Sequence, residues 1–106
     1  MSLDVHLTIN DEDVYSANIT HNLIKMADEA GLYSILWGPE EMNLTKAYQL
    51  VEPLRLGLKI LKSEPERFMK LNASNGWGKY ENFVPFVEKY LEACLEYLNA
   101  DISVSR

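Results

Sequence analysis

Apolar and polar side chains alternate at both ends of the chain, which is the pattern of a β-strand with one buried face. Near the start, the apolar positions are Leu3, Val5, Leu7 and Ile9, with Asp4, His6 and Thr8 between them. Near the end, Ile102 and Val104 alternate with serines. Because a short isolated strand is marginally stable, we expect these terminal strands to pair with each other and to pack on the helices. The pattern leaves their relative direction open.

The apolar spacing changes to a helical period after Asn18, which we expect to cap the first helix. The apolar stripe of that helix consists of Ile19, Leu23, Met26, Ala27 and Ala30. Gly31 is expected to end it in a left-handed conformation. A second long apolar face, from about Asn82 to Leu98, predicts a last helix. The whole pattern predicts a mainly α (α+β) fold: a compact helical domain of four to five helices with a small two-stranded sheet formed by the N- and C-terminal strands.

Length and charge narrow the class of protein. The chain has 106 residues, so residues 1–106 are taken as a single domain. Ten basic and sixteen acidic residues give a net charge of −6. This sign disfavours binding to phosphates, so neither nucleic acid nor an anionic membrane is an expected partner. The lone cysteine, the lack of a leader-like start and the lack of an apolar run of about 18 residues predict a cytoplasmic protein.

Three stretches of the chain resemble a known family. They are ANITHNLIKMADEAGLYSILWGPEE (17–41), PERFMKLNASNGWGKYENFVPFV (65–87) and ISVSR (102–106). They look like a family of small proteins encoded by bacteria and their phages, and the resemblance covers nearly the whole chain. It implies an intracellular protein of bacterial or phage origin, and it brings no reaction, ligand or catalytic residue with it.

The residues that most often carry chemistry are few and scattered. His6 and His21 are the only histidines, and no short-spaced pair of metal ligands is present. At roughly 100° per residue, His21 is expected to point away from the apolar helix stripe into water. Cys94 lies on the apolar face of the last helix and is expected to be a buried, inert thiol. The sequence contains neither a nucleophile motif nor a phosphate loop, so we predict no catalytic residue, no metal and no cofactor.

Carboxylates gather on the solvent side of the last helix. Glu88, Glu92 and Glu96 follow one another at four-residue steps. Like charges at this spacing repel by a few tenths of a kcal/mol per pair. A solvated helix face tolerates that repulsion without further consequence, and this is the simpler interpretation. The alternative is an acidic surface that docks a basic partner or imitates the phosphate backbone of nucleic acid.

The stretch NGWG places Trp77 on a tight loop between two helical segments. A tryptophan in such a loop often folds inward and covers the junction of two helices. We therefore predict that Trp77 plugs the end of the core, with a stacking platform for a ligand as the alternative. A second polar cluster, Asn18 to Asn22 with Arg106, is expected to anchor the end of the chain, with anion binding as the alternative.

Taken together, these patterns favour a non-enzymatic protein–protein interaction module with an acidic surface. Its partner would be another protein or a second copy, because the aromatic stretches Tyr33–Trp37 and Trp77–Phe83 offer apolar area for self-association. The alternative is a small-ligand-binding protein or minor enzyme that uses a cluster of four residues. Those residues are His21, Asn22, Trp77 and Arg106.

Overall fold

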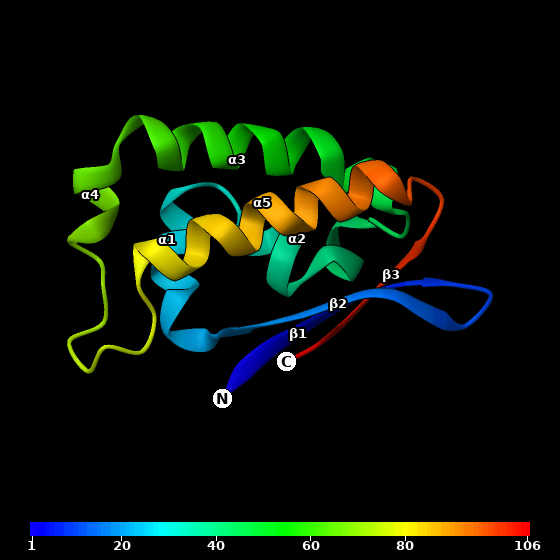
Figure 1. Cartoon of the computed structure of the whole chain (residues 1–106), viewed down its shortest axis with the longest axis horizontal. Helices are drawn as coiled ribbons and strands as arrows, with labels where there is room; N and C mark the ends of the chain where they lie inside the picture. The colour runs from blue at the N-terminus through cyan, green and yellow to red at the C-terminus, as the bar shows by residue number, and fades with distance from the viewer.

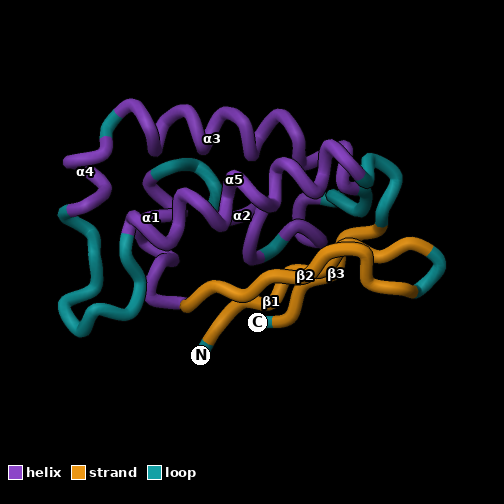
Figure 2. Tube along the Cα trace, viewed as in Figure 1, coloured by secondary structure: helices purple, strands orange, loops and turns teal.

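The chain folds into two layers, an antiparallel sheet and a layer of helices on one of its faces (Figures 1 and 2). A computed structural model describes residues 1–106. In chain order the elements are β1 (Ser2–Ile9), β2 (Glu12–Thr20), η1 (His21–Leu23), α1 (Ile24–Glu29), α2 (Tyr33–Trp37), η2 (Pro39–Met42), η3 (Ala47–Leu50), α3 (Val51–Ser63), α4 (Pro65–Met69), α5 (Tyr80–Glu96) and β3 (Asp101–Ser105). No helix has both the length and the apolar run needed to cross a bilayer.

The sheet has three strands in the order β2–β1–β3, and both neighbours run antiparallel to β1. The terminal strands do pair, as β1 with β3, but the predicted two-stranded sheet is wrong because β2 adds a third strand. β1 and β2 form a hairpin whose turn residues, Asn10 and Asp11, both have positive φ values, 53° and 66°. Such a turn matches the twist of the two strands that it joins.

The two faces of the sheet differ in chemistry because side chains alternate along each strand. Leu3, Val5 and Leu7 of β1 are fully buried under the helices. Their partners on the same face are Ile19, Ala17 and Tyr15 of β2 and Val104 and Ile102 of β3. The other face is polar and open, with His6 flanked by Ser16 and Ser103. The helices therefore cover only the apolar face.

A bulge interrupts the hairpin near its turn. Leu7 lies opposite Tyr15, whereas the next residue, Thr8, lies opposite Asp13, so Val14 is the extra residue. A bulge re-aims side chains locally and increases the strand twist. Val14 and Tyr15 consequently both pack against the core at the edge of the sheet.

The first helical segment begins later than the sequence predicts. Asn18 and Ile19 still belong to β2, and Thr20 caps η1 by accepting a hydrogen bond from the Asn22 N–H at 3.2 Å. The prediction of a helix capped by Asn18 is therefore wrong. Ile19 is buried as the last inward-facing residue of a strand, which mimics the first position of a helical stripe. Gly31 does adopt the predicted left-handed conformation, with φ 75°.

Helices α3 and α5 pack against each other and close the core above the short helices (Figure 1). The fully buried residues of α5 include Phe83, Val87 and Tyr90. Gly57 of α3 lets the Leu32 side chain pack close to the helix backbone, since a Cβ atom built there would lie 2.2 Å from Leu32 Cδ2. This packing holds α5 directly over the sheet, where its remaining face meets β2.

Candidate functional site: a groove between β2 and α5

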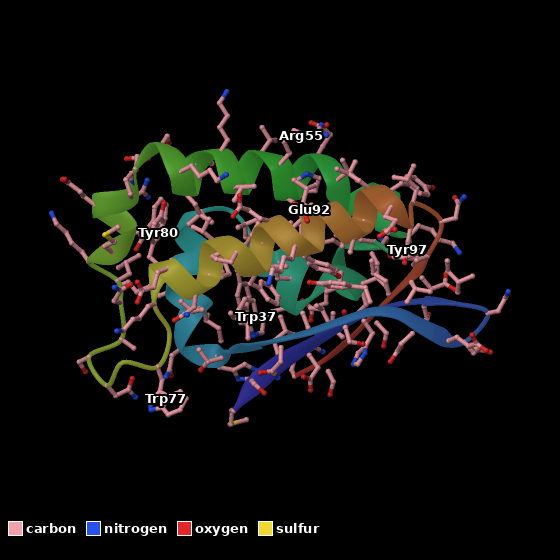
Figure 3. The ribbon with its side chains drawn as sticks, viewed as in Figure 1. Trp37, Arg55, Trp77, Tyr80, Glu92 and Tyr97 are labelled. Atoms are coloured by element: carbon pink, nitrogen blue, oxygen red, sulfur yellow. The ribbon has the colours of Figure 1, made fainter.

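The larger of the two hollows on the surface lies between β2 and α5, with a volume of about 360 Å³. One wall comes from the bulge of β2, which contributes Val14 and Tyr15. The other wall is about the last two turns of α5 and the residue that follows it, with Lys89, Glu92, Glu96 and Tyr97. Figure 3 shows Glu92 and Tyr97 spaced along this helix, above the strands. Because only two elements build it, the hollow is an open trough rather than an enclosed pocket, and we call it the acidic groove.

The ring of Tyr15 forms the aromatic floor of the acidic groove and stacks on the buried ring of Tyr90. The ring centroids of Tyr15 and Tyr90 are 5.9 Å apart, and their planes differ by 12°. Tyr90 is fully buried, and its hydroxyl has no hydrogen-bond partner. Burial raises the pKa of Tyr90, and a smaller contribution comes from the nearby Cys94 thiol. Both rings thus remain neutral across the physiological range, and the ring of Tyr15 is the one that offers apolar surface to the groove.

The carboxylates of the groove are those of Glu92 and Glu96, and both side chains are exposed. Burial raises the pKa of Tyr15, followed by the charges of Cys94 and Glu92, so the Glu92 carboxylate lies close enough to act on that hydroxyl. Lys89 is the one cation in the lining. Two carboxylates against one ammonium give the trough a net negative charge.

Glu88, the third residue of the predicted acidic stripe, does not line the groove. Its carboxylate accepts a hydrogen bond from the Lys62 ammonium of α3 at 2.7 Å. The stripe is therefore divided: Glu92 and Glu96 face the groove, whereas Glu88 joins two helices. The sequence could not show this division, because it depends on where α3 lies.

Trp77 does not plug the core. Its side chain is 72% exposed, at the far end of the loop between α4 and α5 (Figure 3). The loop is held by its backbone: the Trp77 carbonyl accepts a hydrogen bond from Asn22 Nδ2 at 2.9 Å. Gly78 has φ 106°, and a Cβ atom there would lie 2.9 Å from Asn22 Cβ, so only glycine fits this close approach. The plug interpretation is wrong because the short-range contacts belong to the backbone and not to the indole.

Trp37, and not Trp77, is the buried tryptophan, with 2% of its side chain exposed between the helices and the sheet (Figure 3). His21 lies near it, with ring centroids 6.2 Å apart. The His21 Nε2 and Trp37 Nε1 atoms are both buried without hydrogen-bond partners. The prediction that His21 points into water is wrong, because His21 follows a strand and opens a 3₁₀ turn instead of continuing an α-helix.

Arg106 closes the chain against the α2–η2 corner. Its guanidinium donates to the Trp37 carbonyl and, at 2.6 Å, to Glu40 Oε1. A hydrogen bond from its own backbone, and then the Arg106 guanidinium, hold the pKa of the Glu40 carboxyl below its usual range. The second hollow, about 90 Å³, lies beside this pair, between Tyr33 and Glu41.

The four residues of the predicted ligand cluster do not share a cavity. Asn22 contacts the backbone of Trp77, and His21 contacts Trp37, but neither they nor the Trp77 indole line a hollow. Only Arg106 borders one, and its charge is already matched by Glu40. Arg106 anchors the end of the chain to the Trp37 carbonyl and Glu40, so the predicted anchoring by Asn18 to Asn22 is wrong.

Hydroxyl, imidazole and carboxylate groups do meet on the open face of the sheet. His6 Nδ1 lies 2.9 Å from Ser16 Oγ and 3.4 Å from Asp13 Oδ2. A nucleophilic triad needs the acid and the hydroxyl on opposite ring nitrogens, whereas here both approach the same one. The Asp13–Ser16–His6 cluster therefore lacks the geometry of a catalytic relay.

The remaining reactive groups are separated or buried. No three histidine, cysteine or acidic side chains come close enough together to hold a metal ion. Cys94 is buried, as predicted, and burial raises the pKa of its thiol to about 12. A thiol with this pKa is almost fully protonated at neutral pH and is a poor nucleophile.

Comparison with protein-family models, curated proteins and solved structures finds no match to this chain. The acidic groove is therefore assessed on its own geometry. It combines a flat aromatic floor, a net negative wall and an opening along a strand, and these are properties of a surface that binds an extended chain.

Proposed function

We propose that this protein is a non-enzymatic protein–protein interaction module whose acidic groove docks a basic segment of a partner protein in the cytoplasm. The observation that carries the proposal is the pair of exposed carboxylates, Glu92 and Glu96, in one groove with the ring of Tyr15. Lysine and arginine side chains match such a surface because their stems pack on aromatic rings while their charged ends reach carboxylates.

The overall charge supports a basic partner. At −6, the protein repels acidic surfaces and attracts basic ones over distances of about a Debye length, about 10 Å in 0.1 M salt. Charge of this kind increases the rate of encounter and selects the partner more than it increases affinity. The aromatic floor then supplies apolar area that can be buried after encounter.

The proposal is tested with a fluorescein-labelled peptide of about eight residues in which lysine and threonine alternate. Fluorescence anisotropy measures its Kd for the unchanged protein and for the double variant Glu92→Gln/Glu96→Gln. We expect the double variant to bind roughly tenfold more weakly, because both carboxylates of the groove are lost. The matched control is Glu88→Gln, which removes a carboxylate of the same helix that points to Lys62 instead.

The salt dependence of peptide binding is a second, independent test of the proposal. Raising the salt concentration from about 0.05 M to about 0.5 M should weaken binding to the unchanged protein and affect the double variant much less. An affinity that ignores both salt and the loss of Glu92 and Glu96 would overturn the proposal. Equal weakening by Glu88→Gln would move the binding surface away from the groove.

A further inference from the structure

β2 is an edge strand whose outer backbone groups have no partner in the fold. The strand order β2–β1–β3 leaves it with a neighbour on one side only. The His21 N–H donates a hydrogen bond to the Met1 carbonyl, so these two opposed residues form a hydrogen-bonded pair. Two and four residues further along β1, Leu3 lies opposite Ile19 and Val5 lies opposite Ala17. Hydrogen-bonded pairs alternate in an antiparallel ladder, so the backbone N–H and C=O groups of the odd-numbered β2 residues point toward β1. The N–H and C=O groups of Ser16 and Asn18 therefore point outward.

The open part of this edge has defined limits. The bulge at Val14 interrupts regular pairing at one end, and the acidic residues Glu12 and Asp13 lie beyond it. At the other end the Trp77 loop contacts Asn22, just past the end of the strand. Between these limits, residues 15–20 offer about 20 Å of regular edge, enough to pair with a strand of about six residues.

The acidic groove borders the same edge. Tyr15 begins the regular part of the edge, and its side chain also forms part of the groove. A strand added beside β2 would turn alternate side chains toward α5, where Glu92 and Glu96 lie, and the others toward the open face beside Ser16 and Asn18. In the first set, the side chain beside Tyr15 would meet the carboxylates and the aromatic floor of the groove. The second set would meet small polar side chains.

We infer that the basic partner segment binds as an added β-strand along residues 15–20 of β2, with a lysine or arginine side chain beside Tyr15 in the acidic groove. This inference rests on the proposed function and specifies how the partner is held. Backbone hydrogen bonds to Ser16 and Asn18 supply affinity that is independent of sequence, and the groove selects a basic side chain at the Tyr15 end of the edge. The partner motif is therefore an extended segment with a basic residue at the end that lies beside Tyr15.

A second copy of this chain is a poor occupant of the same edge. Pairing β2 with β2 of another copy would bring two acidic grooves together, in a protein that carries a net charge of −6. Like charges facing one another across an interface disfavour association. Charge complementarity thus selects a basic partner.

The test compares Ser16→Pro with Ser16→Ala, using the labelled lysine–threonine peptide described above. Proline removes the outward N–H of Ser16, and its ring blocks the approach of a strand, while the ladder to β1 stays intact. Alanine removes only the hydroxyl that contacts His6. We expect Ser16→Pro to weaken peptide binding at least tenfold and Ser16→Ala to leave it within about twofold. Circular dichroism and urea unfolding of both variants confirm that each is folded.

Peptides with methylated backbone amides test strand addition on the unchanged protein, so the result does not depend on whether a variant folds. A strand turns only alternate amides toward its neighbour. Methylating one alternate set of peptide amides should abolish binding, and methylating the other set should leave it intact. Equal effects of the two modifications would overturn strand addition.

The outcomes separate this inference from the proposed function. If Glu92→Gln/Glu96→Gln weakens binding and Ser16→Pro does not, the groove binds a basic segment but not as a strand, and the inference fails alone. If neither variant changes binding, both fail. A dimer in sedimentation that Ser16→Pro dissociates would overturn the inference in favour of a second copy.

Discussion

Strands β3 and β2 lie at opposite edges of the same sheet, and the chain covers part of the edge at β3, at Asp101 and Ile102, but none at β2. There the Ile102 N–H donates to the Thr45 carbonyl at 2.9 Å, and Lys46 bridges to Asp101 beside it. No such segment runs along β2, where the outer groups of Ser16 and Asn18 face outward. Natural proteins usually cover or blunt exposed edges, since an open edge pairs with other strands. An edge left open beside a charged groove is thus the more selective of the two surfaces.

The same comparison explains how the open edge avoids indiscriminate pairing. A bulge at Val14 and the carboxylates of Glu12 and Asp13 interrupt it toward the hairpin turn. These are recognised ways of blunting an edge. They limit regular pairing to residues 15–20, whose Tyr15 end borders the acidic groove. In the proposed binding mode, an added strand meets the charges of the groove at that end.

The largest effect should come from matched proline substitutions at the two edges. Ile102→Pro removes the hydrogen bond to Thr45 and leaves that carbonyl without a donor, so we expect unfolding to become easier by about 2–3 kcal/mol. Ser16→Pro removes an N–H that has no partner and should cost no more than about 1 kcal/mol. Urea unfolding measures both, and Ile102→Val controls for side-chain packing. Equal losses would mean that the β2 edge is also covered.

Much of the covered side of the molecule could be predicted from the sequence. The strict alternation from Leu3 to Ile9 and at Ile102 and Val104 identified both terminal strands and their pairing. The apolar face of the last helix placed Cys94 in the core. These patterns are visible because each element buries one continuous face, which fixes the period of its apolar residues.

The open edge could not be predicted in the same way. In β2 the bulge at Val14 breaks the alternation, so the strand lacks a strict two-residue period. Ile19, its last inward-facing residue, happens to stand four positions before Leu23 and mimics a helix stripe. One local signal was available: Asn10-Asp11 directly after an alternating strand is typical of a tight hairpin turn. The groove itself depends on the placement of α5 over β2, which no local pattern encodes.

A smaller change in the free energy of unfolding, in the stabilising direction, is expected for a substitution of Tyr90, which lies beneath the open edge. Tyr90 buries a hydroxyl that has no hydrogen-bond partner, which costs free energy in the folded state. Tyr90→Phe should therefore raise the free energy of unfolding by about 1 kcal/mol while keeping the stack with Tyr15. Urea unfolding provides the measurement, with Tyr15→Phe as a control at the partly buried partner ring. A loss of stability would indicate that the groove supplies a partner for this hydroxyl.

The ion pair on the closed edge should contribute less. Lys46 Nζ lies 2.6 Å from Asp101 Oδ1, but both side chains are about half exposed. Exposed pairs are typically worth about 0.2–1 kcal/mol and are screened by salt. Asp101→Asn should lower stability by about 0.5 kcal/mol in low salt and by less in about 1 M salt. Glu96→Gln, which removes a carboxylate with no ion pair, is the control. A loss that persists at high salt would assign the effect to the backbone of β3 instead.

The smallest effect is expected at Trp77, which lies just past the Thr20 end of the open edge. Its indole is 72% exposed, so Trp77→Ala should change the free energy of unfolding by no more than about 0.5 kcal/mol. Trp37→Phe leaves Trp77 as the sole tryptophan, whose fluorescence should then show the long-wavelength emission of indole in water. A blue-shifted emission, or a loss of several kcal/mol in Trp77→Ala, would mean that the indole packs inward. The loop would then cover the end of β2, and the contrast between the two edges would be weaker than the structure indicates.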